Sequence, residues 1–227
     1  MINKKQNKGF VKQHIVPKTY LNHFAVPGRK KKTFLIGVRQ KNLSHFIRNT
    51  DDVGYIDNYY DDDAYENIKH WEHFYNNEIE APLSQVITNL IAGLTLSNYT
   101  EGFLKEEERR ILCRFIVTQF IRVPQFIDWQ ITNAKNNLLP KIKEQCLIEL
   151  GAEFAEIIDN IEIYDKTYKH MVLSYVNNSR QLERFSQILL SKPWIVYING
   201  CRDFMPFITS DNPIVLSKNP YLHSVGF

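Results

Sequence analysis

The stretch that decides the fold is Phe204–Leu216, FMPFITSDNPIVL, in which two short apolar runs flank the polar break Thr209–Asn212. Pro213 disfavours a helical conformation for the residue before it, and Asp and Asn side chains readily hydrogen-bond their own backbone in tight turns. The pattern therefore predicts a strand, a polar corner and a second strand. Such a corner is either a structural turn or a place where the fold displays chemistry.

Further β-rich segments lie at both ends of the chain, at Thr33–Val38 and Trp194–Asn199. We expect both of them, together with residues 207–216, to form one sheet in which the C-terminal strands pair with Thr33–Val38. Residues 39–64 show no clear periodicity, which predicts a long irregular loop.

Helical periodicity fills the chain from about residue 65 to residue 191. A single apolar stripe includes Trp71, Tyr75, Ile79 and Leu83 at spacings of three and four. Prolines predict a kink at Pro82 and a break near Pro140. The sequence thus predicts a single α+β domain over residues 1–227, with a mainly helical core. Residues 33–38 and 194–216 supply a small, largely antiparallel sheet, and residues 1–12 form a loose basic tail.

Composition excludes several classes of protein. The chain has 227 residues, 44% hydrophobic and 23% charged, as expected for a globular protein with a real core. Its 3 cysteines are far apart, which supports neither a disulfide framework nor a cysteine zinc site. The start lacks the apolar region of a secretory signal, and no apolar run reaches membrane-spanning length. We expect a cytoplasmic protein without a membrane partner. The oligomeric state stays open.

Charge is distributed unevenly along the chain. Residues 1–50 contain 12 Lys and Arg and no acid, whereas residues 51–80 contain 10 acids and a single lysine, Lys69. A basic segment can bind phosphate backbones, and the turn Lys30, Lys31 and Lys32 holds its most exposed candidate contacts. The alternative is that the basic and acidic segments face each other within the fold.

Gln119 and Arg122 are the most informative polar pair. On a helix they lie on the same side as Phe115, within the apolar stripe. An arginine on a buried face needs an anionic partner, and Glu80 and Asp211 are the candidate carboxylates. The pair either binds a phosphate or carboxylate ligand, or forms a buried strut between helices and sheet.

The chain resembles a known family in three separated segments. These are HIVPKTYLNHF at 14–24, the Gln–x–x–Arg–x–Pro pattern at 119–124, and TSDNP at 209–213. In this order they are similar to the uncharacterised bacterial family called domain of unknown function 4238. That family has no established activity, so the resemblance implies candidate positions and no mechanism. Its members usually continue past the corner with another strand and loop, so we expect this chain to lack a C-terminal part of the fold.

The candidate catalytic residues are therefore His14, Gln119, Arg122, Ser210, Asp211 and Asn212. Imidazole, guanidinium, amide and carboxylate groups together suit phosphoryl chemistry, with a divalent metal on Asp211 and Glu80 as one option. The leading hypothesis is a phosphodiester-cleaving or nucleotide-processing enzyme, a nuclease-like metal-dependent hydrolase whose basic arm steers nucleic acid or another phosphate-bearing ligand. The alternative is a non-catalytic ligand- or nucleic-acid-binding module in which these residues are structural.

Overall fold

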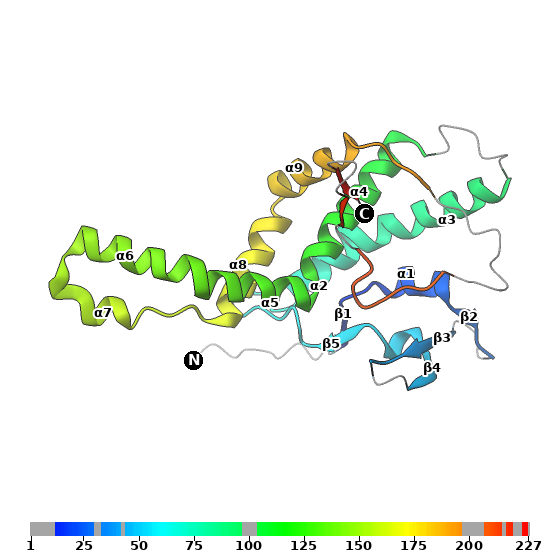
Figure 1. Cartoon of the computed structure of the whole chain (residues 1–227). Coiled ribbons are helices and arrows are strands. Elements are labelled where there is room, and N and C mark those ends of the chain that lie inside the picture. Colours follow the sequence, from blue (N-terminus) through cyan, green and yellow to red (C-terminus); the bar gives the residue numbers. More distant parts are fainter. Residues whose placement is uncertain are drawn as a thin grey trace.

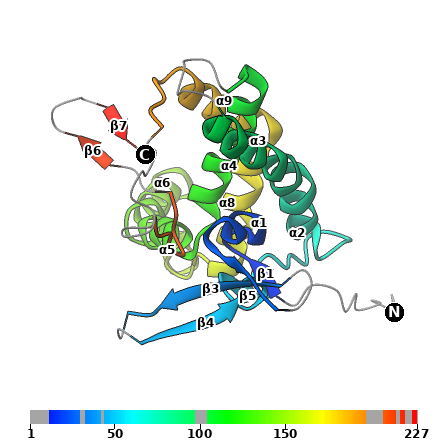
Figure 2. The same cartoon turned by 90° about the vertical axis from the view of Figure 1, so that its right-hand side faces the viewer.

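The structure is a computed structural model that describes residues 12–29, 33–41, 44–96, 104–196, 207–214, 217–219 and 224–226. A helical body occupies its centre, and a long helical arm made of α6 and α7 extends from one side of it (Figure 1). Strands β1, β3, β4 and β5 lie together below the helices, whereas β6 and β7 stand apart from them (Figure 2).

Helices run through the middle of the chain, as the periodicity predicts. The α-helices are α1 (Lys18–Leu21), α2 (His70–Phe74), α3 (Ala81–Leu96), α4 (Glu106–Arg122), α5 (Pro124–Asn133), α6 (Leu139–Leu150), α7 (Ala155–Asp159), α8 (Asp165–Asn177) and α9 (Ser179–Leu190). Short 3₁₀ segments occur at η1 (Asn22–Phe24), η2 (Thr50–Asp52) and η5 (Ala152–Phe154), and π-helical segments at η3 (Tyr75–Glu80) and η4 (Ala134–Leu138).

Each π-helical segment ends two residues before a proline, Pro82 or Pro140. The N–H groups of Ala81 and Leu139 donate to carbonyl oxygens five residues earlier. A proline inside a helix lacks an N–H and crowds the carbonyl four residues before it, and a wider turn relieves that crowding while the helix continues. The break expected near Pro140 is therefore wrong. The helix ends instead at Gly151, whose φ of 101° favours glycine.

The described strands form three small antiparallel sheets. β1 (Lys12–His14) pairs with β5 (Tyr55–Asp57), β3 (Phe34–Arg39) pairs with β2 (Val26–Pro27) and β4 (His45–Asn49), and β6 (Ser217–Asn219) pairs with β7 (Ser224–Gly226). The predicted fold class, α+β with a mainly helical core and little antiparallel sheet, is confirmed.

Two details of the predicted sheet are wrong. Among the described residues, β3 pairs with β2 at Phe34 and Leu35 and with β4 along Leu35–Arg39, and it pairs with no C-terminal strand. Residues 194–196 and 207–214 form no strand, and the rest of those two segments lies outside the described residues. The predicted long loop at 39–64 also contains β4 and β5. Local β-propensity therefore identified extended segments but not their partners, which are set by packing.

The hydrophobic core joins the start of the chain to the helices. Ile15, Val16 and Leu21 are buried against side chains from the central helices, namely Trp71, Tyr75, Ile79, Leu83, Phe115, Ile121 and Leu173. This core places the segment between β1 and α1 directly beside the C-terminal half of α4.

Candidate functional site

The Ile15 carbonyl oxygen is the centre of a buried polar cluster. Gln119 Nε2 donates to it at 2.8 Å and Arg122 Nε at 3.1 Å, and Arg122 Nε also lies 3.0 Å from Gln119 Oε1. The backbone N–H of Ile15 donates to Gly54 at 2.8 Å. Because the peptide groups of Ile15 are bonded on both sides, this segment is fixed between the loop at Gly54 and helix α4.

Glu80 supplies the charge that a buried arginine requires. Arg122 Nη1 donates to Glu80 Oε1 at 3.0 Å, with the Arg122 side chain 1% exposed and the Glu80 side chain 16% exposed. The guanidinium carbon also lies 4.9 Å from the centre of the Tyr75 ring, a cation–π distance. Glu80 is thus the one of the two carboxylates suggested by the sequence that pairs with Arg122.

The electrostatics of this cluster keep Arg122 charged. Burial lowers its pKa, but Tyr60, Glu80 and Tyr75 outweigh that effect and the net shift is upward. Burial also raises the pKa of Tyr75 to about 12. Glu72, which the sequence did not single out, has its pKa raised to about 7 by burial and by the nearby charge of Glu80.

Two polar atoms of the cluster are buried without a hydrogen-bond partner among the described residues. They are Arg122 Nη2 and the hydroxyl group of Tyr60. Both side chains are fully buried, and the interaction with Tyr60 raises the pKa of Arg122. A buried unpaired donor is costly, so these atoms are the polar groups of the cluster that the described residues leave unsatisfied.

His14 precedes Ile15 but has different partners. Its Nε2 lies 3.3 Å from the Thr50 carbonyl oxygen, and its ring packs edge-on against Tyr55 with centroids 6.0 Å apart. Burial lowers the pKa of this half-buried imidazole. The chain therefore holds His14 near the cluster as a neutral side chain bonded to the backbone.

The corner Thr209–Pro213 lies against α1 and the start of α5. The Tyr20 hydroxyl is 3.2 Å from Thr209 Oγ1, and Gln125 Nε2 donates to Asp211 Oδ2 at 3.4 Å. Ser210 Oγ accepts from the Asn212 N–H at 3.1 Å and donates to the Asn212 carbonyl at 2.8 Å. Ser210 and Asp211 are exposed, and the local bonds are those of a structural turn.

A metal at Asp211 and Glu80 finds no further support in the geometry. Glu80 is occupied by Arg122, and Asp211 contacts Gln125. Among the residues that the structure describes, no three His, Cys, Asp or Glu side chains are arranged so that they could hold a metal ion.

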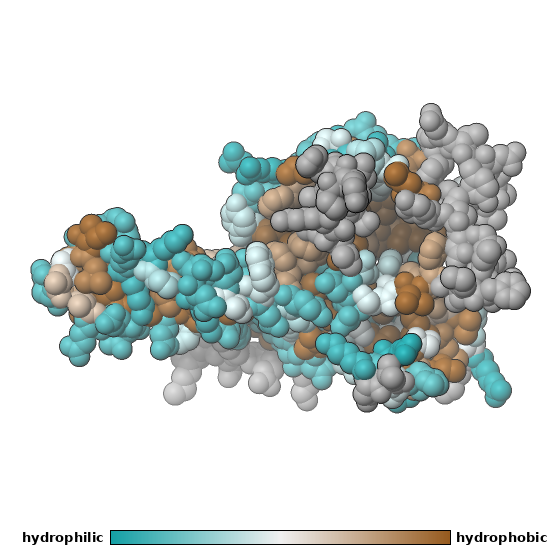
Figure 3. All heavy atoms as spheres, in the orientation of Figure 1, coloured by the Kyte–Doolittle hydropathy of each residue, from teal (hydrophilic) through white to brown (hydrophobic). Residues whose placement is uncertain are grey.

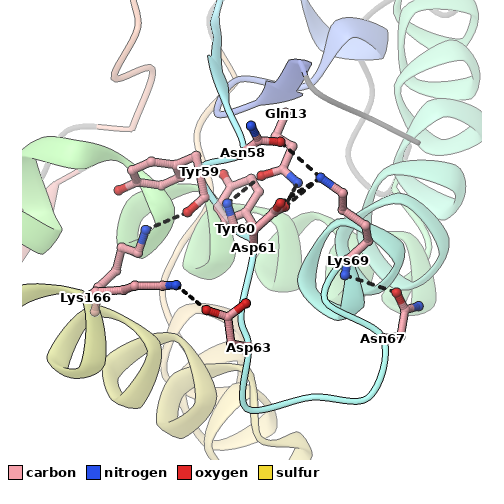
Figure 4. A network of polar contacts seen from close by, with 10 residues as sticks. Gln13, Asn58, Tyr59, Tyr60, Asp61, Asp63, Asn67, Lys69 and Lys166 are labelled. Atoms are coloured by element: carbon pink, nitrogen blue, oxygen red, sulfur yellow. Dashed lines mark hydrogen bonds and ion pairs between the residues drawn. The ribbon is translucent and has the colours of Figure 1, made fainter. Parts of the chain in front are cut away.

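The acidic segment is neutralised in part by cations of the same chain. Lys12 pairs with Asp52 at 2.5 Å, and Lys18 pairs with Asp51. Lys69 Nζ lies 2.8 Å from Asp61, which also accepts from Gln13 Nε2 at 2.6 Å, while Lys166 pairs with Asp63 (Figure 4). The Lys12 and Lys18 pairs favour the expectation that the basic and acidic segments face each other, whereas Lys69 belongs to the acidic segment itself and Lys166 to α8. Lys30, Lys31 and Lys32 lie outside the described residues.

A polar pocket of about 460 Å³ lies between the acidic segment and α8. Its wall includes His170, whose Nδ1 is 3.2 Å from Asp62 Oδ2, close enough for an ion pair but not aligned as a hydrogen bond. Burial lowers the pKa of His170 despite the nearby Asp62. Sequence reasoning missed this pair because the two residues are far apart in the chain and follow no motif.

A larger, apolar groove of about 760 Å³ is bounded by α4, α5, α8 and α9. In Figure 3, apolar side chains gather in the centre of the body around these helices. Most of its lining is aliphatic or aromatic: Ile116, Val117, Phe120, Ile121, Phe126, Tyr168, Met171, Val172, Tyr175, Val176, Phe185, Ile188 and Leu189. Two further lining residues, Gln130 and Lys192, are polar. Neither this groove nor the polar pocket is lined by Gln119, Arg122 or Glu80.

The fold and the buried cluster define an α+β protein in which a Gln–Arg pair on a central helix clamps the N-terminal segment. The chain belongs to the family described as Protein of unknown function (DUF4238), whose model matches residues 12–226. The match covers all three segments of the resemblance and continues past the corner into β7, so it does not support the expected loss of a C-terminal part. Comparisons with curated proteins and with solved structures returned no match. No described helix is long and apolar enough to cross a membrane.

Proposed function

We propose that this protein is a non-catalytic ligand-binding module whose ligand lies in the apolar groove between α4, α5, α8 and α9. The observation that carries the proposal is the separation of the groove from the buried cluster. Gln119, Arg122 and Glu80 bond to one another and to a backbone carbonyl, and none of the three lines the groove, whose lining is mostly apolar. Its volume of about 760 Å³ is within the range typical of small-molecule sites.

The lining points to the chemical class of the ligand. Aliphatic and aromatic walls favour a long apolar body, and Lys192 places an ammonium group at one side of the groove. Gln130 is on α5, which follows the C-terminal end of α4, whereas Arg109 near the other end of α4 donates to the carbonyl of Leu190, close to Lys192. The two polar groups therefore belong to opposite ends of the groove. An apolar chain with a carboxylate head, as in a fatty acid, fits this distribution of charge.

Displacement of a fluorescent probe tests this proposal. Anilinonaphthalene sulfonate, which combines aromatic rings with one anionic group, is titrated into the protein and displaced by dodecanoate or by dodecanol. We expect dodecanoate to bind more tightly than the alcohol, Ile188→Glu to abolish binding, and Lys192→Gln to remove the preference for the acid. Lys41→Gln, at an exposed lysine between β3 and β4, is the matched control and keeps the preference. Absence of binding, or binding that Ile188→Glu leaves intact, refutes the proposal.

The second candidate is the phosphodiester-cleaving or nucleotide-processing enzyme expected from the sequence, and one observation favours it. Arg122 Nη2 and the Tyr60 hydroxyl are buried donors without a partner among the described residues, as a site for a phosphate oxygen requires. Cleavage of single-stranded nucleic acid that Arg122→Lys removes, and salt-dependent binding that replacement of Lys30, Lys31 and Lys32 by Gln weakens, would support this candidate. A protein that neither binds nor cleaves nucleic acid at low salt excludes it.

A further inference from the structure

The arm, residues 134–164, projects from the helical body (Figure 1). Helices α5, η4 and α6 continue into one another, so residues 124–150 form a rod of about 40 Å at 1.5 Å per residue. Beyond the tip, η5 and α7 fold back along α6. Not one residue of α6 is buried.

Large apolar side chains remain exposed along this arm, and Figure 3 shows them among the hydrophilic ones. Their exposed fractions are Leu138 44%, Ile142 40%, Ile148 71%, Leu150 53%, Phe154 41% and Ile157 68%. Single exposed apolar residues are ordinary, but contiguous apolar patches on a monomer rarely exceed a few hundred Å². In the part of the chain that the structure describes, no segment covers this many apolar side chains of a short helical pair.

The spacing of the α6 residues matches a helix-packing ridge. Leu138, Ile142, Cys146 and Leu150 follow one another at intervals of four residues. Rows of this spacing on two helices interdigitate in the commonest class of helix packing, at a crossing angle of about −50°. The midpoint of the row lies between Ile142 and Cys146, and Cys146 is a free thiol of intermediate exposure.

Charges along the arm are self-complementary. Lys141 lies in the half nearer the body, and Glu149, Glu153 and Glu156 lie at the tip, whereas Lys135 and Lys143 already contact Asp165 and the Asp159 carbonyl of the same chain. If two arms cross in an antiparallel orientation, the basic half of one faces the acidic tip of the other. A two-fold axis produces this contact twice, as in the isologous interfaces of most homodimers.

We propose that the arm is a dimerisation element, in which α6 of one protomer packs antiparallel against α6 of a second copy with Cys146 near the two-fold axis. The same surface patch then supplies both sides of the interface, and the exposed apolar row becomes its core. This inference is independent of the ligand proposed for the groove.

Sedimentation velocity over a concentration series tests the dimer. We expect the full chain to form a dimer, and Ile142→Glu to raise its dissociation constant by at least about 30-fold, as expected for a residue at the centre of an interface. Ile47→Glu is the matched control, since Ile47 is an isoleucine on β4 that is 68% exposed. A wild-type chain that is monomeric throughout, or a dimer that Ile142→Glu leaves intact, overturns the proposal.

Charge reversal and cross-linking then test the orientation. Lys141→Glu and Glu149→Lys should each weaken the dimer, and the double variant should restore it, because only an antiparallel pairing brings these positions together. In a Cys201→Ser background, a short bis-maleimide should link two protomers that keep Cys146 but not two copies of Cys146→Ser. Failure of the double variant to restore the dimer, or cross-linking that persists in Cys146→Ser, rules out the proposed geometry.

Discussion

Replacement of Arg122 by methionine separates a structural role from a ligand-binding role. Methionine keeps much of the length of the side chain and removes its charge. The change breaks the 3.0 Å ion pair with Glu80 and the hydrogen bonds to the Ile15 carbonyl and to Gln119. Glu80 is then left almost buried without a partner. Breaking a buried pair in this way costs about 3–5 kcal/mol in the free energy of unfolding.

This loss is large enough to measure by urea unfolding or thermal melting. For a domain of this size each kcal/mol shifts the melting temperature by about 2–4 °C, so the expected decrease is about 6–20 °C. Arg29→Met is the control, because Arg29 is exposed and its replacement should change the stability by less than about 0.5 kcal/mol. The double variant Arg122→Met with Glu80→Leu should recover much of the loss, since it leaves no unpaired charge.

The opposite outcome would refute the structural role. If Arg122 serves to bind an anionic ligand, its buried charge destabilises the ligand-free protein. Replacement of Arg122 would then leave the stability unchanged or raise it. A melting temperature of Arg122→Met equal to that of Arg29→Met would therefore favour a ligand-binding site at Arg122.

Two further predictions concern Glu72 and Gly54. Burial raises the pKa of Glu72 from its ordinary value of 4.5 to about 7. The folded state therefore binds the proton more tightly, and stability should decrease as the pH rises from about 4.5 to 7. After allowance for partial exposure the loss is about 1–2 kcal/mol, and pH-dependent urea unfolding should show it in the wild type and in Glu78→Gln but not in Glu72→Gln. Gly54 has a φ of 66°, and a Cβ there would lie 3.2 Å from Leu21 Cδ1, so Gly54→Ala should lower the unfolding free energy by about 1–2 kcal/mol. Gly37→Ala is the control, because a Cβ at Gly37 has no atom within 4 Å; an equal loss in both variants would contradict the backbone argument.

The sequence predicted the parts of the fold that depend on local pattern. Trp71, Tyr75, Ile79 and Leu83 are buried on one helical face, as their spacing indicates. The partners of β3 could not be predicted, because propensity identifies an extended segment without its neighbours. The π-helical turns were not predicted either. A proline in a helical pattern is compatible with both a kink and a widened turn, and only the structure distinguishes them.

The buried polar cluster could likewise be predicted only as far as local pattern allows. A buried arginine requires an anionic partner, and the sequence analysis named Glu80 as one of two candidate carboxylates. Arg122 also binds the backbone carbonyl of Ile15, and a contact to a backbone group cannot be predicted from residue type. The groove could not be predicted from the sequence, because its lining residues have the same spacing as those of a buried helix face.

The three segments that carry the family resemblance meet in space, and their contacts explain why they occur together. Gln119 and Arg122 of the second segment bind the carbonyl of Ile15 in the first. Tyr20 of the first segment contacts Thr209 of the third, and its ring also packs 5.8 Å from that of Phe115 on α4. The three patterns are therefore parts of one clamp that fastens the N-terminal segment to α4 and the C-terminal corner to that segment and to α5. A clamp needs these side chains even where no reaction occurs, so the patterns themselves are an argument for a common architecture and not for a common catalytic mechanism.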